Sequence, residues 1–257
     1  MGLSQITSWI NYRKNSVTKY RVHSPFVYEL ATGVFPPQPG ETFSNHPAEQ
    51  WRSECLADHA VVHVEDFGTG KTGTRRISAI AARSAKTPKE GQLLHRIVKH
   101  FQPKKMLELG TSLGITTLYQ ATAIDFDRYI SIEGAGAIAE KALGRFAKLN
   151  LPVEVRVGTF ESQLEPALRE LGQVDYIFFD GNHREKPTLR YFETILPYAH
   201  ADSVFIFDDI HWSPEMESAW KKIKAHPQVK LSIDLFHFGL IFFRKEQQEK
   251  EDFILRW

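Results

Sequence analysis

Residues 106–117 read Met-Leu-Glu-Leu-Gly-Thr-Ser-Leu-Gly-Ile-Thr-Thr, and the prediction of the fold starts from them. A short apolar run is followed at once by a turn with two glycines and then by residues suited to a helix. Gly110 has no Cβ where the chain leaves the strand, so a ligand can lie against the backbone, and Gly114 lets the next helix begin close to the sheet. The stretch therefore predicts a strand, a ligand-binding turn and a helix.

The alternation of strand and helix continues downstream, which is typical of βα units and a parallel sheet. The predicted strands are residues 106–110, 129–133, 153–157, 174–180 and 203–208, and the predicted crossover helices are residues 116–123, 138–149, 162–171, 187–198 and 214–224. After Pro227, residues 230–236 and 240–244 are separated by only a few residues and predict an antiparallel hairpin. We therefore expect an α/β fold with a Rossmann-like, doubly wound sheet.

Length and composition restrict the classes of function. The 257 residues fit one large domain with an appendage, since a typical domain has about 150 residues. Lys and Arg number 32 and Asp and Glu number 31, so the net charge is +1 and disfavours binding to long nucleic acid or to an anionic membrane. The single cysteine excludes an intramolecular disulfide, and we expect a cytoplasmic protein.

The chain divides into three parts by pattern. Residues 1–90 are predicted to be a mainly helical extension that caps the core and selects the substrate, residues 91–245 form the core, and residues 246–257 are a charged tail. The extension mixes aromatic with basic residues, but the helical spacing of Ile6, Trp9 and Ile10 favours packing over contact with RNA. Residues 245–252 are predicted to be a solvated helix or a frayed end.

A second glycine-rich segment resembles a phosphate-binding P-loop at its end. Residues 65–72 read Glu-Asp-Phe-Gly-Thr-Gly-Lys-Thr. A P-loop requires glycine where Glu65 stands, and a carboxylate beside a triphosphate would repel it. We therefore interpret the segment as a flexible basic loop.

Glu133 strengthens the prediction that the first glycine turn binds a cofactor. It ends the next predicted strand and can accept both hydroxyls of a ribose. NAD enzymes and S-adenosylmethionine (SAM) enzymes share this arrangement. A pyrophosphate requires the G-x-G-x-x-G loop, whereas SAM has no phosphate and tolerates the looser G-x-x-x-G found here. Glu108, within the strand, would disfavour a pyrophosphate and suits a cofactor that carries a sulfonium and an ammonium.

With these features the chain resembles the class I SAM-dependent methyltransferases, and within them the O-methyltransferases related to catechol O-methyltransferase. The resemblance runs over residues 91–244 and rests on residues 91–94 with 106–111, on residues 130–133 and on residues 158–161. It implies a seven-stranded sheet whose last strand is antiparallel. The cofactor-binding residues that it implies are Glu108, Gly110, Thr111, Ser112, Gly114, Glu133, Thr159, Phe160 and Asp180.

The resemblance also implies a divalent metal. Asp180 follows one buried run and Asp208 and Asp209 follow the next, at the sheet edge where ligands bind in open α/β folds. These three align with the relatives' metal ligands, although the relatives often have Asn at the position of Asp209. Carboxylates suit Mg²⁺ or a similar cation, and the nearby His183 and His211 favour a softer metal.

Catalytic roles follow from the same segments. Asp180 is predicted to act through a metal, and without a metal the base would be His183 or His211. The structural alternative is that Asp208 or Asp209 caps the next helix and that His211 packs with Trp212.

The predicted function is methyl transfer from SAM to a hydroxyl of a small-molecule acceptor, with Mg²⁺ or another divalent cation as an optional cofactor. The alternatives are a SAM-binding sensor or partner protein without turnover, and an NAD-dependent oxidoreductase. Methylation of DNA is disfavoured because residues 180–183 read Asp-Gly-Asn-His and lack the Asp/Asn-Pro-Pro-aromatic turn. No nucleic-acid or membrane partner is expected, and a homodimer is compatible with the sequence.

Overall fold

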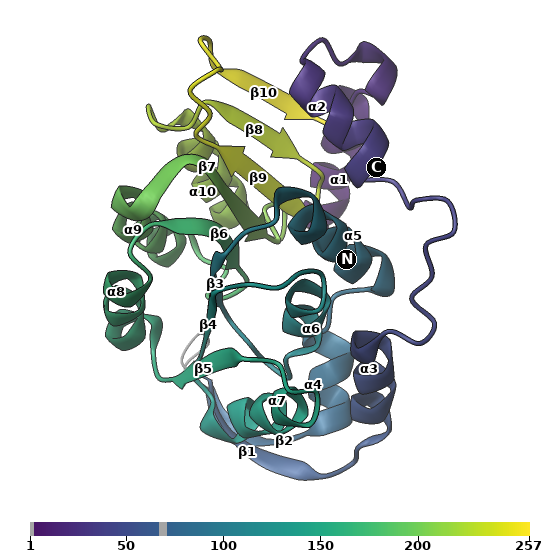
Figure 1. The fold of residues 1–257 in the computed structure, drawn as a ribbon, viewed down its shortest axis with the longest axis vertical. Helices are drawn as coiled ribbons and strands as arrows, with labels where there is room; N and C mark the ends of the chain where they lie inside the picture. Colours follow the sequence, from purple (N-terminus) through teal and green to yellow (C-terminus); the bar gives the residue numbers. More distant parts are fainter. Residues whose placement is uncertain (1–2, 67–70) are drawn as a thin grey trace. The chain divides into compact units, whose positions relative to one another are not determined.

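The computed structural model describes residues 3–66 and 71–257 (Figure 1). The chain divides into two compact units. One unit consists of Met1–Pro36 and Leu168–Trp257, and the other consists of Pro37–Ala167. Residues 1–90 therefore contribute to both units. The P-loop-like segment lies partly outside the described residues, which end at residue 66 and resume at residue 71.

The unit Pro37–Ala167 holds the strand, turn and helix on which the fold prediction rests. Strand β3 (Lys105–Leu109) pairs in parallel with β4 (Arg128–Glu133), which pairs in parallel with β5 (Val153–Val157). The helices that follow these strands are α6 (Ile115–Ala121), α7 (Gly136–Lys148) and α8 (Phe160–Leu171), the last of which extends into the other unit. Each predicted βα unit in this region is confirmed.

Upstream of β3 the same unit contains five further elements, of which the resemblance over residues 91–94 implied only the last, as a helix leading into β3. They are α3 (Pro47–Ala57), β1 (Val61–Asp66), β2 (Lys71–Arg76), α4 (Ile77–Ser84) and α5 (Pro88–Phe101). Strands β1 and β2 form an antiparallel pair. Helix α5 begins with a capping box, in which Thr87 and Glu90 satisfy each other's backbone amides.

The other unit holds the second half of the strand pattern, in the order β10, β8, β9, β7, β6. Its strands are β6 (Val174–Phe179), β7 (Ala199–Asp208), β8 (Leu231–Asp234), β9 (Phe238–Phe242) and β10 (Glu251–Ile254). Strand β9 is antiparallel to both β7 and β8, and β6 is parallel to β7. The predicted hairpin and the antiparallel last strand of the seven-stranded pattern, β3 to β9, are therefore confirmed.

The helices of this unit come from both ends of the chain. They are α1 (Leu3–Asn15), η1 (Lys19–Arg21), α2 (Pro25–Glu29), η2 (Leu30–Val34), α9 (Glu185–Ile195), η3 (Leu196–Tyr198) and α10 (Pro214–Ala225). Helices α9 and α10 pack against each other. Of the described helices, none has both the length and the apolar character that a membrane span needs.

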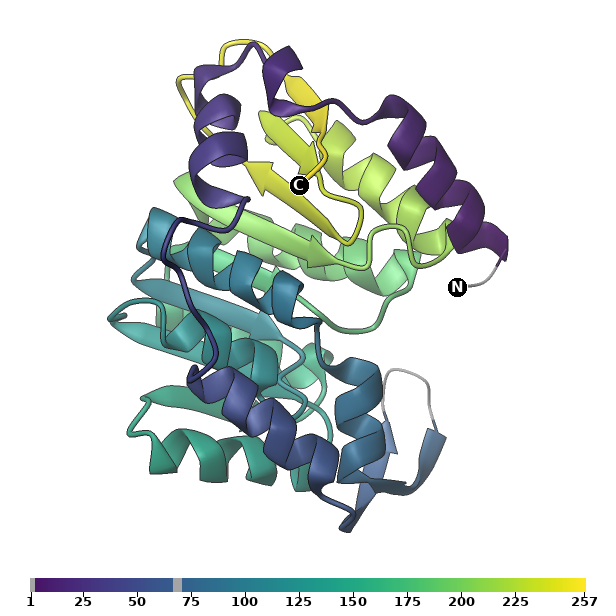
Figure 2. The same cartoon turned by 90° about the vertical axis from the view of Figure 1, so that its right-hand side faces the viewer.

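The C-terminal segment differs from the predicted helix or frayed end. Strand β10 pairs in parallel with β8 and adds an eighth strand to the seven-stranded pattern. Beyond it, Leu255 is buried, forms a bridge with Val17, and accepts a hydrogen bond from the Tyr12 hydroxyl at its carbonyl. In Figure 2 the two ends of the chain, purple and yellow, accordingly lie in the same part of this unit.

Helix α1 packs through a different face from the one its apolar spacing indicated. Tyr12 is buried, whereas Ile6, Trp9 and Ile10 are 44%, 45% and 54% exposed. The prediction that these three residues form a packed face is therefore wrong. Trp9 borders a cavity described below.

Candidate functional site

The turn between β3 and α6 is held in a conformation that only a few residue types adopt easily. Gly110, Ser112 and Gly114 have φ values of 105°, 47° and 73°. A Cβ on Gly114 would lie 2.6 Å from the Phe146 ring and 3.0 Å from Ala142, both on α7. Gly114 is thus fixed by its backbone and by the close approach of α7, a contact that the sequence did not predict.

Four amides of this turn, those of Gly110, Thr111, Ser112 and Gly114, are bound within the protein. The Gly110 and Thr111 amides donate to the Ile132 carbonyl at 2.9 and 3.3 Å, and the Gly114 amide donates to Thr111 at 2.9 Å. The Ser112 amide donates to a Glu133 carboxylate oxygen at 2.7 Å. A loop that binds a pyrophosphate turns its amides toward the ligand, and this one does not.

Glu133 lies where β4 ends and links two loops. One carboxylate oxygen accepts the Ser112 amide, and the other accepts the Ala135 amide at 2.8 Å. These two bonds fix the orientation of a half-buried carboxylate beside the glycine turn. The ribose-binding role of Glu133 stays a prediction.

The structure places Glu108 differently from the prediction. Its side chain is 0% exposed, and its carboxylate accepts hydrogen bonds from Thr117 at 2.6 Å, Gln120 at 3.0 Å and Ser131 at 2.6 Å. The charge therefore faces the protein interior, where it ties α6 to β3 and β4. Glu108 supports the turn and does not present its carboxylate to a cationic cofactor.

The loop after β5 completes the set of three loops at this edge of the unit. Gly158 has a φ of 150° and donates its amide to the Glu133 carbonyl at 2.9 Å. Thr159 follows it and caps the start of α8 through its contact with the Ser162 amide, and Phe160 is the first residue of α8. All three loops follow the carboxyl ends of parallel strands, where ligands bind in open α/β folds.

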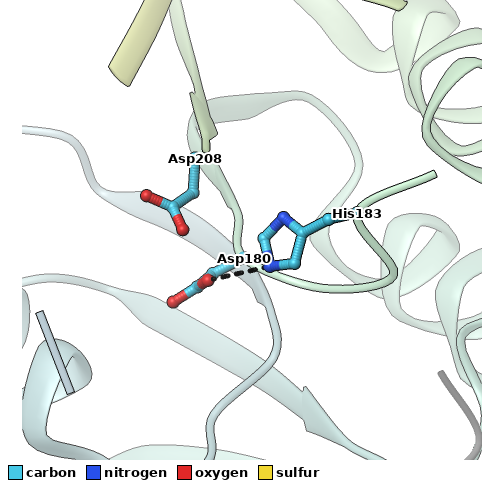
Figure 3. Close-up of side chains that lie close together, drawn as sticks. All are labelled: Asp180, His183 and Asp208. Atoms are coloured by element: carbon cyan, nitrogen blue, oxygen red, sulfur yellow. Dashed lines mark ion pairs between the residues drawn. The ribbon is translucent and has the colours of Figure 1, made fainter. Parts of the chain in front are cut away.

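In the other unit, the carboxyl ends of β6 and β7 bring a carboxylate pair and an imidazole together (Figure 3). Ligand atoms of Asp180, His183 and Asp208 all lie within 4.8 Å of one another. The His183 Nε2 atom is 3.7 Å from an Asp180 oxygen, and Asp208 is 1% exposed. Two carboxylates and one imidazole form a donor set that fits a divalent cation.

Asp209 is not part of this cluster. Its backbone has a φ of 53°, and its side chain lines a separate cavity of about 370 Å³. The other residues lining this cavity are Gln5, Trp9, His211, Trp212, Phe236 and His237. Of the predicted metal ligands, the structure therefore gathers Asp180 and Asp208 and replaces Asp209 with His183.

His211 is held between two carboxylates. Its Nδ1 atom lies 2.9 Å from Glu217 and its Nε2 atom lies 2.8 Å from Asp234, while the ring stacks on Phe236. Burial lowers the pKa of His211, but the two carboxylates outweigh it and the net pKa is raised. With both nitrogens engaged and the charged form favoured, His211 does not fit the predicted role of base.

Two features of this region were missed by sequence reasoning. The contribution of α1 to the cavity, through Gln5 and Trp9, required knowledge of which helical face turns inward. Phe236 has a φ of 73°, which is rare for a bulky side chain. Hairpin turns ordinarily place glycine or asparagine in this conformation. A phenylalanine at this position therefore gives no sequence signal for it.

Comparisons with known proteins find methyltransferases. Residues 107–210 match the model of a family described as a methyltransferase domain. A catechol O-methyltransferase of Niastella koreensis is 30% identical over 129 residues, which are 48% of this chain and 57% of that protein. The chain thus spans little more than half of that relative's length. These matches confirm the resemblance that the sequence predicted.

Solved structures show the same fold. An O-methyltransferase from Bacillus cereus, solved in complex with SAH (S-adenosylhomocysteine), has a TM-score of 0.59 and 18% identity, and the match covers 85% of this chain and 96% of that one. TomG from Streptomyces achromogenes, an O-methyltransferase solved with SAM, has a TM-score of 0.55 and 21% identity, covering 77% and 98%. The chain has the class I methyltransferase fold.

Proposed function

We propose that the protein is a SAM-dependent methyltransferase that transfers a methyl group to an oxygen of a small-molecule acceptor. The observation that carries the proposal is the pairing of the Gly110 to Gly114 turn with the Glu133 carboxylate. This carboxylate lies 2.7 Å from the Ser112 amide, at the edge where β3 and β4 end. The similarity to methyltransferases over residues 107–210 supports it.

The engaged amides of the turn favour SAM over NAD. An oxidoreductase of this fold needs amides that point at a pyrophosphate, whereas the Ser112 amide points at the Glu133 carboxylate. SAM carries a sulfonium and an ammonium and no phosphate, so the negative charge of Glu133 is compatible with it. Glu133 would accept the ribose hydroxyls, and the segment with Thr159 and Phe160 would lie beside the adenine.

Methyl transfer requires that the acceptor oxygen is aligned with the methyl group and that its proton is removed. Methyl transfer is an in-line displacement at sulfur, so the protein gains rate by positioning the acceptor oxygen and stabilising its deprotonated form. Asp180, His183 and Asp208 would hold a divalent cation, which would lower the pKa of a bound hydroxyl. Without a cation, the His183 imidazole would accept the proton while Asp180 orients it.

Isothermal titration with SAM and with SAH tests the cofactor assignment. We expect binding by the unaltered protein and a loss of about tenfold or more in Glu133→Ala, because two ribose hydroxyls lose a charged acceptor. Asp202→Asn, an exposed carboxylate on β7, serves as the control. Failure of both ligands to bind, or tight NADH binding instead, would refute the proposal.

Turnover is tested separately, with a panel of hydroxylated acceptors and radiolabelled SAM. Methyl transfer to an oxygen supports the enzyme, whereas cofactor binding without transfer to any acceptor favours a SAM sensor. The role of the cation is tested by metal analysis and by treatment with EDTA. If Asp180, His183 and Asp208 bind a metal, Mn²⁺ binding followed by electron paramagnetic resonance weakens in Asp208→Asn, and EDTA abolishes activity.

A further inference from the structure

Helix α1 turns an apolar and basic face away from the core of its unit. Ile6, Trp9, Ile10 and Arg13 are spaced at i, i+3, i+4 and i+7, so they lie on one side of the helix. The opposite side carries the buried Tyr12, whereas the first three residues are between 44% and 54% exposed. A helix ordinarily turns such a stripe toward the core, so an outward stripe marks an interaction surface.

Contacts at the C-terminal end of α1 hold this face outward. The Tyr12 hydroxyl donates to the Leu255 carbonyl. The Arg256 guanidinium donates to the Arg13 carbonyl at 2.7 Å and to the Ser16 hydroxyl at 2.9 Å. Figure 2 shows α1, the dark purple helix, at the edge of its unit. The exposure of the apolar stripe is therefore built into the fold of this unit.

The segment that contains α1 is basic, although the whole chain is not. Residues 1–28 contain no Asp or Glu, and their Lys and Arg residues are Arg13, Lys14, Lys19 and Arg21. These four exceed the net charge of +1, so the rest of the chain is net acidic. Within residues 3–66 and 71–257, no carboxylate forms a salt bridge with any of the four. The near-zero net charge, which disfavours an anionic membrane for the chain as a whole, therefore hides a cationic segment.

From this combination we propose that the outward face of α1 docks on the surface of an anionic phospholipid bilayer. Ile6, Trp9 and Ile10 enter the headgroup region, while Arg13 and Lys14 contact lipid phosphates. The helix lies on the bilayer, since Leu3–Asn15 is too short to cross it. The inference does not rest on the proposed methyl transfer, because the family match covers residues 107–210 and no residue of α1 is assigned to the cofactor.

Two aromatic rings of the segment are paired with cations. The Arg13 guanidinium lies 5.6 Å from the centroid of the Trp9 ring, and the Lys19 Nζ atom lies 5.5 Å from the centroid of the Tyr20 ring, which is 82% exposed. Indole and phenol rings favour the headgroup level of a bilayer, where long basic side chains reach the phosphates. Ring and cation thus occupy the same level of a lipid surface.

A lipid surface is the partner that uses both kinds of side chain. A nucleic acid would pair with the cations through its phosphates but would leave Ile6 and Ile10 in water. An apolar protein surface would cover these two residues but would leave Arg13 and Lys14 without a counter-charge. An anionic bilayer supplies phosphates and an apolar layer side by side.

Co-sedimentation of the full chain with vesicles tests the docking. The probes are vesicles of phosphatidylcholine alone and vesicles with equal parts of phosphatidylcholine and phosphatidylglycerol. We expect the anionic vesicles to bind at least about tenfold more tightly, and added NaCl to weaken this binding, because salt screens exposed charges. No binding to either vesicle, or equal binding to both, overturns the inference.

Variants separate the basic from the apolar contribution. Lys14→Gln should weaken binding to anionic vesicles about fivefold, whereas Lys148→Gln, also exposed but on α7, should not. Ile6→Ser combined with Ile10→Ser should weaken it at least about tenfold, and Leu143→Ser, exposed on α7, is the matched apolar control. All these side chains are exposed, and circular dichroism checks that each variant is folded. Vesicle affinity that is unchanged in either the basic or the apolar variant overturns the assignment to this face.

Tryptophan fluorescence reports whether the helix enters the lipid. Brominated phosphatidylcholine in the anionic vesicles should quench part of the emission of the bound chain, and Trp9→Phe should remove most of this quenching while binding persists. Phenylalanine keeps an aromatic ring at this position, so the variant changes the signal more than the affinity. Quenching that is the same in Trp9→Phe overturns insertion through α1.

Two further measurements distinguish other partners. Light scattering without lipid overturns the lipid proposal if the chain is a dimer that the double isoleucine variant dissociates and no vesicle binds, since the face is then an interface between copies. Binding of a single-stranded RNA oligonucleotide without binding of vesicles overturns it in favour of nucleic acid. Titration with SAM is independent of these results, so failure of the docking leaves the proposed methyltransferase in place, and failure of SAM binding leaves the docking in place.

Discussion

At the scale of single residues, Gly114 combines a backbone requirement with a packing requirement. We predict that Gly114→Ala destabilises the protein by about 2–4 kcal/mol, because the new Cβ meets Phe146 at 2.6 Å and the residue keeps a φ of 73°. Gly144→Ala on α7 is the matched control. It has no atom within 4 Å of its Cβ position, and we expect it to be neutral or stabilising by about 0.5–1 kcal/mol. Urea unfolding measures both, and equal effects would contradict the packing argument.

At the residue scale, the direction in which the Glu108 side chain points could not be predicted from the sequence. The residue type and its place before the turn were correctly seen, but which face of β3 it occupies depends on the strand's neighbours. We predict that Glu108→Gln costs about 2–4 kcal/mol in unfolding free energy, because its amide group would face the donors Thr117 and Ser131. SAM affinity, measured by titration where the variant is folded, should change by less than about threefold. A large loss of affinity would return Glu108 to the cofactor site.

At the scale of elements, strands could be predicted where their own hydrophobic pattern marks them. Elements whose position depends on a neighbouring strand or helix could not. The runs that became β3 to β9 are apolar or alternate apolar with polar residues, and they are bounded by turns, so their positions followed from the sequence. Strand β10 reads Glu-Asp-Phe-Ile, which carries no such signal, and it forms because β8 offers an edge to pair with. Helix α1 likewise has an apolar stripe, but the buried Tyr12 decides which face turns inward.

The C-terminal segment connects elements from both ends of the chain, and Leu255 is its buried anchor at 1% exposure. We predict that Leu255→Ala lowers stability by about 2–4 kcal/mol, through the lost contacts and the cavity that remains. Gln248→Ala, exposed in the preceding loop, should change stability by less than about 0.5 kcal/mol. Hydrogen exchange followed by mass spectrometry should show faster exchange in α1 and β10 of the first variant. Unchanged exchange there would mean that α1 holds its place without this anchor.

At the scale of the whole molecule, each unit contains a half-buried histidine, and the pKa values of the two are shifted in opposite directions. His46, in the unit Pro37–Ala167, accepts the Ala48 amide at the start of α3 and stacks on Tyr119. Burial, and then the neighbouring His95, lowers the pKa of His46 to about 4. In the other unit, the carboxylates of Asp234 and Glu217 overcome burial and raise the pKa of His211. Acid and alkali should therefore weaken different parts of the chain.

For His46 the folded pKa lies below the unfolded value of about 6.5, so the unfolded state binds the proton more readily. Its contribution is complete above pH 6.5 and is lost as the pH falls toward 4, by up to roughly 3 kcal/mol. His211 behaves in the opposite way, because its contribution is complete below pH 6.5 and is lost as the pH rises through its raised folded pKa.

Hydrogen exchange from pH 4 to 9, corrected for intrinsic rates, should therefore show acid weakening in α3 and alkaline weakening around β8. His46→Asn, which preserves the helix cap, should remove the first effect, and His211→Gln should remove the second. If either variant keeps the pH dependence of its parent, the corresponding histidine is not its source.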